Sequence, residues 1–358
     1  MTRKRFLRLA AAALVLAPLA AQQLGRDQLR EIEKAVSEEM AKQKIPGMSV
    51  AVGTNHRLVW SAGFGLADLE NSVPARAQTV YRLGSISKPI TAVAAMQLAE
   101  GGKLDLDAPI QKYVPSFPEK PWPITPRLLL SHLSGIRHYS GVEEVNSTRR
   151  YTNLTEPLKI FAADPLLFEP GAKYSYTTYG YCLLGAAVEG ASGMRFGDYI
   201  RERIFEPAGM RTARPDSVHD IIPHRARGYR KTPAGTIENC ALADTSNKMP
   251  GGGMVSTPED LVKFANAVMK GQLVKPETRD QMYTRQQTRE GKPVPYGLGW
   301  QIQEPERLKW VSHGGAQQGI STLLVTLPAE GFSVALMTNL ERAVLQPLAL
   351  RIAEIVLR

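Results

Sequence analysis

The chain has 358 residues, of which 43% are hydrophobic and 22% are charged, so it is long enough to bury one large core or two smaller ones. This composition excludes a largely disordered chain. The formal net charge is +10, but the basic residues beyond the N-terminus are scattered, so we expect no nucleic-acid role and only a weak attraction to anionic cell-envelope polymers. Neither His-Glu-x-x-His nor paired Cys-x-x-Cys occurs, and we predict no metal and no organic cofactor.

The N-terminus has the pattern of a secretory signal peptide. Residues 2–8 carry four basic side chains and no acid, and residues 9–21 form an apolar, alanine-rich run that ends in small residues. Cleavage near Ala21 would lower the net charge from +10 to +6. The run is short for a membrane span, although an uncleaved leader acting as an anchor is the alternative. A mitochondrial presequence would be amphipathic, whereas this run is evenly apolar, so we expect a periplasmic or secreted protein.

The elements before residue 108 read as a helix, a hairpin and a second helix. Helical spacing of apolar residues over 27–42 predicts an amphipathic helix. Two β-rich runs, 48–52 and 58–66, flank a turn at residues 55 and 56 and predict a hairpin. A helix over 90–100 should then end at Gly101-Gly102.

The pattern changes between residues 108 and 239, where prolines separate short helical pieces at 126–133, 179–189 and 196–204. Sheet character returns after residue 239. Ser256-Thr-Pro-Glu259 resembles a capping box opening a helix to Met269. Four candidate strands and a closing helix follow, at 297–303, 309–312, 320–327, 332–338 and 343–357. We therefore predict an α+β fold in which residues 24–107 and 240–358 form an antiparallel sheet flanked by terminal helices, with residues 108–239 inserted as a helical domain.

Ser85-Ile-Ser-Lys88 is the one Ser-x-x-Lys sequence of the chain. Residues three apart share a helix face, so the Lys88 amine can reach the Ser85 hydroxyl. Serine needs a base to become a nucleophile, and a buried lysine serves when its pKa is lowered enough to leave it neutral. Alone, the spacing is also typical of a capping serine with a solvated lysine. Pro89 removes a backbone donor near the helix start, so we predict a distorted first turn beneath Ser85.

The segment around Ser85 resembles the nucleophile segment of class C beta-lactamases, low-molecular-weight penicillin-binding proteins and related esterases. Further segments that resemble this family follow in the same order, at 102–107, 124–135, 168–171, 181–185, 251–257 and 313–315. Within the family, residues 113–120 and 130–139 look most like the mitochondrial serine beta-lactamase-like protein and its bacterial relatives. The resemblance implies a beta-lactamase/transpeptidase-like fold, with Ser85 as nucleophile and Lys88 as the group that activates it.

The family's second motif is Tyr-x-Asn, and the matching place here reads Tyr176-Thr-Thr178. The resemblance implies that Tyr176 shuttles a proton, as phenolate or by relay, provided that Lys88 lowers its pKa. Thr178 replaces an asparagine that holds the substrate carbonyl in relatives, so beta-lactam turnover is less expected than acyl-enzyme formation. Tyr151-Thr-Asn153 fits the letters of the motif but lacks its surroundings, and we interpret it as a chance match.

The third motif of the family, Lys-Thr-Gly, becomes His-x-Gly in its esterase and peptidase branches, and His313-Gly-Gly315 fits the latter form. The resemblance implies that the backbone N–H groups of Ala316 and Ser85 form an oxyanion hole beside Gly315. His313 would contact a substrate carboxylate or adjust the local field, or it is a structural histidine at a strand end. His132 and Ser131 are interpreted as buried packing groups.

These residues predict acyl transfer through Ser85. The substrate interpretations are a peptidase acting on small peptides or D-amino-acid amides, a carboxylesterase, and a beta-lactamase. A non-catalytic protein that keeps the penicillin-binding fold, for example one that forms filaments, is the alternative from another class. The presence together of Ser85, Lys88 and Tyr176 favours an enzyme. Cys182 lies in an apolar run and reads as a buried thiol, so no disulfide with Cys240 is expected. The sequence leaves the oligomeric state open.

Overall fold

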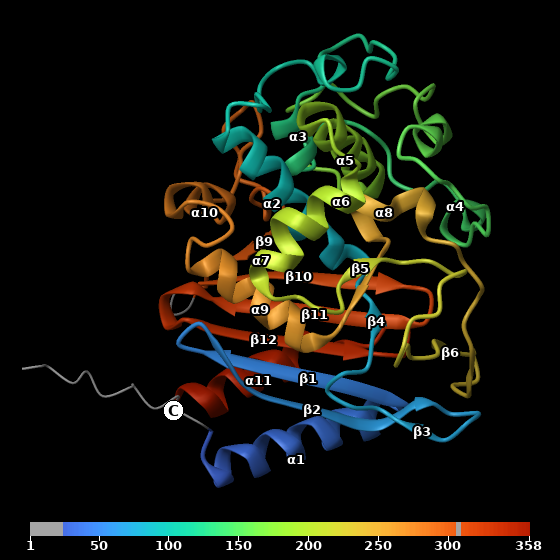
Figure 1. The fold of residues 1–358 in the computed structure, drawn as a ribbon, viewed down its shortest axis with the longest axis vertical. Helices are drawn as coiled ribbons and strands as arrows, with labels where there is room; N and C mark the ends of the chain where they lie inside the picture. The colour runs from blue at the N-terminus through green and yellow to red at the C-terminus, as the bar shows by residue number, and fades with distance from the viewer. Residues whose placement is uncertain (1–23, 306–308) are drawn as a thin grey trace, which may run out of the picture.

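The computed structural model describes residues 24–305 and 309–358, so the predicted leader lies outside the described part. Its centre is a seven-stranded sheet in the order β3-β2-β1-β12-β11-β10-β9, with every neighbouring pair antiparallel (Figure 1). The predicted antiparallel sheet is confirmed. The strands are β1 (Gly47–Thr54), β2 (Arg57–Asp68), β3 (Val73–Pro74), β9 (Gln301–Gln303), β10 (Trp310–Gln317), β11 (Ile320–Leu327) and β12 (Phe332–Thr338).

The two faces of this sheet support different layers. The terminal helices α1 (Arg26–Gln43) and α11 (Gln346–Leu357) pack on each other and on one face, and α9 (Pro258–Met269) packs on the other. Strand residues alternate between the layers, as their two-residue period requires. On β12, Val334 and Leu336 belong to the α1/α11 core, while Ala335 and Met337 face the helical side.

The hairpin β1/β2 follows from its turn. Asn55 and His56 both have positive φ, 49° and 56°, which suits the right-handed twist of the flanking strands. The turn and both strands lie where the sequence predicted them.

The helical part of the molecule lies beyond the β9–β10 side of the sheet (Figure 1). Its long helices are α2 (Ser87–Glu100) and α5 (Thr178–Ser192), and they pack against each other. Segment 108–239 was predicted to be an all-helical insertion, and this is wrong for its last part, since it contains helical turns and, towards its end, short strands. These elements are α3 (Pro126–Leu130), α4 (Val142–Val145), α6 (Phe196–Ile200), a π-helical turn (Arg201–Phe205), α7 (Glu206–Ala208), β5 (Arg214–Pro215), β6 (Tyr229–Lys231) and β7 (Ile237–Asn239).

Two local predictions need correction. Helix α9 is capped by Thr257, whose hydroxyl accepts the Asp260 N–H, and not by Ser256. Pro258 explains why the cap is one residue later than predicted, because proline favours the first helical position and the residue before it is then the cap. The predicted strand 297–303 is regular only at 301–303, because Gly299 has a φ of 93° that a regular strand does not accommodate.

The remaining short elements lie around the start of α2 and α5. Strand β4 (Tyr81–Arg82) pairs with β8 (Met254–Ser256), and β8 with β5. Two short turns, a 3₁₀ turn at Ser246–Lys248 and α8 (Met249–Gly252), precede β8 and contact α5. No helix in the described ranges has the length and apolar content needed to cross a membrane.

Candidate active site

Ser85 lies on a 3₁₀ turn, Gly84–Ile86, immediately before α2. Leu83, the residue before this turn, is held by two hydrogen bonds. Its N–H donates to Met254 O at 2.8 Å, and its carbonyl oxygen accepts from Thr322 Oγ1 at 2.9 Å. An irregular turn is thus present at Ser85, but the predicted cause is wrong, because the turn lies before Pro89 and is held by the contacts of Leu83. Pro89 lies in the first turn of α2, where its missing N–H costs no helical hydrogen bond.

Lys88 is fully buried and contacts three oxygens. Its Nζ lies 3.0 Å from Ser85 Oγ, 3.1 Å from Thr178 Oγ1 and 2.7 Å from Gly251 O. A neutral amine has two N–H donors and one lone pair. The carbonyl of Gly251 can only accept, so it takes one donor, Thr178 can take the second, and the lone pair can receive the Ser85 proton.

The electrostatics around Lys88 favour that neutral amine. Burial is the main cause that lowers the pKa of Lys88 to about 7; Cys182 acts in the opposite direction, and the positive charge of Lys248 acts in the same direction as burial. No carboxylate of the described residues pairs with Lys88. The amine can therefore accept a proton near neutral pH.

Tyr176 lies over this amine, with Lys88 Nζ 4.7 Å from the centre of its ring. Burial raises the pKa of Tyr176 well above its usual value, against an opposing contribution from a hydrogen bond with Ser85. The expectation that Lys88 lowers this pKa is not met. Tyr176 is a neutral phenol at pH 7, which leaves proton relay as the role that its position allows.

Thr178 is the first residue of α5 and is buried against Lys88. The sequence comparison placed it at a substrate-binding position, whereas its hydroxyl here helps to orient the amine. Position 251 must be glycine for Gly251 O and Thr178 to lie together around the Lys88 amine. A Cβ at this position would lie 2.6 Å from Thr178 Cγ2. The sequence signalled Gly251 only through the Gly-Gly-Gly run that resembles the family.

Strand β10 passes next to Ser85. A Cβ on Gly315 would lie 2.1 Å from Leu83 O, so only glycine allows this approach. Gly84 has a φ of 53°, and a Cβ there would lie 3.1 Å from Ala316 N. The Ala316 backbone thus lies beside the turn that carries Ser85, as an oxyanion hole made from their two N–H groups requires.

His313 lies within β10, not after a short strand as predicted, and it is buried. Its Nδ1 is 2.7 Å from Gly314 O, which can only accept, so Nδ1 carries the proton. Its Nε2 then accepts from the Tyr296 hydroxyl at 2.9 Å. Burial, aided by Lys88, lowers the pKa of His313 to about 3. The ring is neutral and both nitrogens are occupied, so direct binding of a substrate carboxylate is not supported by this arrangement.

His132 lies at the centre of the aromatic residues behind Tyr176. Its ring is 4.3 Å from the Tyr176 ring and 4.6 Å from the Tyr296 ring, centre to centre. Its Nδ1 accepts the Thr177 N–H at 3.1 Å. The side chain is buried, as predicted, and it supports Tyr176 and the start of α5. Tyr296 was not predicted as a site residue, because no motif marks it.

Tyr151-Thr-Asn153, the chance match, serves a local turn. Asn153 Oδ1 accepts the N–H groups of Thr155 and Glu156, and Arg149 lies over the Tyr151 ring. Neither Tyr151 nor Asn153 contacts Ser85 or Lys88.

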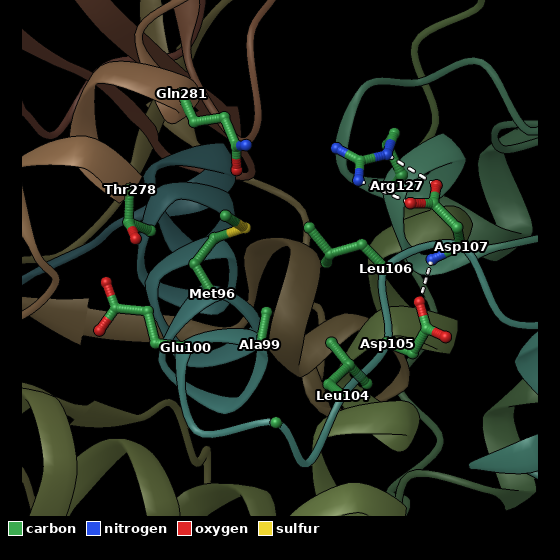
Figure 2. Close-up of a pocket in the computed structure, with 11 residues that line it drawn as sticks. Met96, Ala99, Glu100, Leu104, Asp105, Leu106, Asp107, Arg127, Thr278 and Gln281 are labelled. Atoms are coloured by element: carbon green, nitrogen blue, oxygen red, sulfur yellow. Dashed lines mark hydrogen bonds and ion pairs between the residues drawn. The ribbon is translucent and has the colours of Figure 1, made fainter.

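A cavity of about 400 Å³ lies at the far end of α2, formed by Met96 and Ala99 on one side and Leu104 and Leu106 on the other (Figure 2). Its lining includes residues of segment 102–107, one of the segments that resemble the family. Asp107 and Arg127 form two hydrogen bonds of 2.7 Å at its rim and tie α3 to the turn after α2. The residues that line this cavity do not include Ser85, Lys88 or Tyr176.

Other reactive groups of the described chain lie apart from this centre or are inert. Cys182 is buried, burial raises its pKa to about 12, and it forms no bond with the half-buried Cys240. Within residues 24–305 and 309–358, no three histidine, cysteine or acidic side chains are grouped to hold a metal ion.

Comparison with known proteins shows the family and the fold over most of the chain. The mitochondrial serine beta-lactamase-like protein LACTB of Bos taurus is 32% identical over 91% of this chain and 78% of its own. The octameric penicillin-binding protein homologue of Pyrococcus abyssi is 26% identical, with a TM-score of 0.80 over 92% of this chain and 77% of its own. The D-amino acid amidase of Ochrobactrum anthropi SV3 shares the fold, with a TM-score of 0.80 at 23% identity over 92% of this chain and 99% of its own. The model of the Beta-lactamase family matches residues 32–357, and the chain belongs to this family.

Proposed function

We propose that the protein is a serine hydrolase that forms an acyl-enzyme on Ser85 and acts on amide bonds of small peptides or D-amino-acid derivatives. The observation that carries this proposal is the buried Lys88 amine, which lies 3.0 Å from Ser85 Oγ and has no carboxylate partner among the described residues. A structural lysine would be expected to pair its charge or reach solvent.

The acylation step follows from the contacts. The Ser85 hydroxyl gives its proton to the Lys88 lone pair while Oγ forms a bond to the substrate carbonyl carbon. The carbonyl electron pair moves to oxygen, where the N–H groups of Ser85 and Ala316 would stabilise the negative charge. The oxyanion then collapses, and the bond to the leaving group breaks.

The leaving amine needs a proton, and Lys88 has become an ammonium. The phenol of Tyr176 can donate its own proton and recover one from Lys88, so that no net charge is left on the ring. Water then attacks the acyl group, with Lys88 taking the water proton and returning one to Ser85. The three side chains end in their starting states.

The substrate class is proposed from the site and from relatives. His313 is neutral and both of its ring nitrogens are hydrogen-bonded, so it offers no histidinium to bind the carboxylate of a beta-lactam, and Thr178 orients Lys88. Solved structures with this fold include a D-amino acid amidase and a hydrolase with promiscuous acyltransferase activity. Aromatic D-amino acid amides are therefore the first substrates to test.

Intact-mass spectrometry after exposure to a fluorophosphonate probe tests the nucleophile. The wild-type protein should gain one adduct that Ser85→Ala lacks. D- and L-phenylalanine amide, a p-nitrophenyl ester and nitrocefin then separate amidase, esterase and beta-lactamase activity. A folded wild-type protein with no adduct would support the non-catalytic binding protein instead.

We also propose that the protein acts outside the cytoplasm, on the strength of the basic and apolar pattern of residues 1–21. The related LACTB proteins are named as mitochondrial. Expression of the full chain in a bacterial host, followed by fractionation and N-terminal sequencing, distinguishes a cleaved, exported protein from one that is anchored or retained.

A further inference from the structure

His132, which is buried behind Tyr176, has two features that destabilise the fold. Its backbone has a φ of 59°, in the left-handed region that residues other than glycine rarely adopt. Its Nε2 is buried and has no hydrogen-bond partner within residues 24–305 and 309–358, and burying a polar atom without a partner is unfavourable. A phenylalanine ring would fill the same space without leaving such an atom. Packing alone therefore does not explain a histidine at this position.

His132 is hydrogen-bonded to the chain on both sides of Tyr176. Its carbonyl oxygen accepts the Ser175 N–H at 2.9 Å, and its Nδ1 accepts the Thr177 N–H at 3.1 Å. Its ring centre lies 4.3 Å from the centre of the Tyr176 ring. One side chain and its carbonyl thus fix the backbone before and after Tyr176, and the ring supports the phenol from behind.

His138 makes the next contact in the same series. Its Nδ1 accepts the Thr178 N–H at 3.1 Å, and its ring meets the Tyr176 ring edge-on, with the centres 5.7 Å apart. The carbonyl oxygen of Arg137 accepts the Thr177 hydroxyl at 2.7 Å. The N–H groups at the start of a helix have no acceptor within the helix. Two histidines therefore accept two successive N–H groups at the start of α5.

Both histidine rings must be neutral to make these bonds. A backbone N–H can only donate, so each Nδ1 offers its lone pair and the ring proton is on Nε2. Burial favours that form, because it lowers the pKa of His132 well below its usual value and that of His138 to about 4. The two bonds are therefore present throughout the pH range in which Lys88, with a pKa of about 7, is neutral.

We propose, on the basis of the proposed function, that His132, together with His138, is a positioning residue that holds the Tyr176 phenol where it protonates the leaving group. A displacement of about 1 Å in a catalytic group can lower a rate by about 10²-fold, so the backbone on both sides of Tyr176 has to be fixed. The Lys88 amine is held from outside this segment as well, by Gly251 O at 2.7 Å. Loss of the His132 bond should therefore impair leaving-group protonation more than activation of the nucleophile.

Labelling of Ser85 by two phosphonates that carry the same alkyl group separates these two effects. With both probes, Ser85 Oγ forms a bond to phosphorus and its proton goes to Lys88. The fluorophosphonate then expels fluoride, which is a weak base and leaves without a proton. The phenyl phosphonate expels phenoxide, a stronger base, which takes the proton of Tyr176 while the phenol recovers one from Lys88. The ratio of the two rate constants therefore reports on protonation of the leaving group.

His132→Phe keeps an aromatic ring but removes the acceptor for the Thr177 N–H. It should lower the phenyl phosphonate rate constant by about tenfold or more, and the fluorophosphonate rate constant by less than about threefold. His132→Asn supplies a side-chain oxygen as acceptor in place of Nδ1 and should restore most of the phenyl phosphonate rate. Tyr174→Phe changes the ring at the edge of His132 but none of these bonds, and this control should keep the wild-type ratio.

A double variant distinguishes positioning from a structural role. If His132 acts through the phenol, His132→Phe with Tyr176→Phe should be labelled by the phenyl phosphonate as fast as Tyr176→Phe alone, within about twofold. Equal losses with both probes in His132→Phe, or losses that multiply in the double variant, would overturn the proposal.

The remaining outcomes are also decisive. A wild-type protein labelled by the fluorophosphonate alone would contradict the inference, because its phenol would then protonate no leaving group. A wild-type protein that neither probe labels would instead overturn the proposed function. If His132→Phe does not fold, His138→Phe and His138→Asn make the same comparison at the half-buried second histidine, with the same selective loss and recovery expected.

Discussion

The two faces of the central sheet are built for different purposes. The face under α1 and α11 buries an apolar cluster of residues that alternate along β1, β11 and β12. The opposite face buries apolar residues too, but near Ser85 it also encloses two lysines, several tyrosines and the histidines 132 and 313. Burying polar groups lowers stability unless they are hydrogen-bonded. The first face therefore stabilises the fold, and the second buries the polar groups of the site, which are tolerated there when they are hydrogen-bonded.

The largest effect is expected when the proposed base on the polar face is removed. Lys88→Met keeps the length of the side chain but removes the amine, so labelling of Ser85 should fall by about 10³-fold, the size of a typical general-base contribution. The protein should remain folded, because an apolar side chain is cheaper to bury here than an amine. Labelling kinetics and thermal unfolding measure both effects. A labelling rate within tenfold of the wild type would contradict Lys88 as the base.

The reverse experiment truncates the apolar face. Phe332 on β12 is fully buried in the α1/α11 cluster, and Phe332→Ala should lower the free energy of unfolding by about 3–5 kcal/mol. Urea denaturation measures the loss. The labelling rate of the molecules that remain folded should be unchanged, because this residue lies on the face away from Ser85. Phe332→Leu is the matched control, with a smaller loss expected, and an equal loss in both variants would show that cavity formation is not the cause.

The pH dependence of Ser85 labelling tests the polar face alone. The reactive form has a neutral Lys88, whose pKa is lowered to about 7 by burial and by Lys248. The labelling rate should therefore be constant above about pH 8 and fall about tenfold for each pH unit below the pKa. Rates measured at constant ionic strength give the midpoint. A midpoint near the ordinary lysine value would mean that the buried amine is charged in the resting protein.

The smallest effect is expected at the far end of α2. The Asp107–Arg127 pair at the cavity rim is largely exposed, so Asp107→Asn should lower the free energy of unfolding by about 0.5 kcal/mol or less. Chemical denaturation measures that difference. The Ser85 labelling rate should be unaltered, since the substituted group is at the opposite end of the helix. A loss of labelling would show that the turn after α2 is coupled to the nucleophile.

The apolar face was the easier one to predict from the sequence. Strands β11 and β12 were predicted with the bounds that the structure has, because beta-branched and apolar residues fill most of their positions. Helix α11 was predicted to begin at residue 343, but it begins at Gln346, because residues 343–345 have no regular structure. Such errors concern ends of elements, where local propensity is weak.

The polar face was only partly predictable. Ser85, Lys88 and Tyr176 were predicted to lie together because they match motifs of a known family. Their spacing in the sequence alone would not have allowed this prediction. The partners of His313 and the burial of Lys248 depend on contacts between segments far apart in the chain, which no local pattern encodes. Tyr296 lies in a loop before β9, and its contact with His313 follows from the three-dimensional path of that loop.

The order of the strands has a consequence for how the molecule is made. Strand β1 has β2 on one side and β12 on the other, so the two halves of the sheet join only when Met48 meets Thr338. A ribosome releases the first hairpin long before the last strand exists, and such distant pairings form slowly. The nascent chain must therefore spend most of its synthesis with an unpaired strand edge, which is the stage at which chaperones would be needed and at which aggregation would compete with folding.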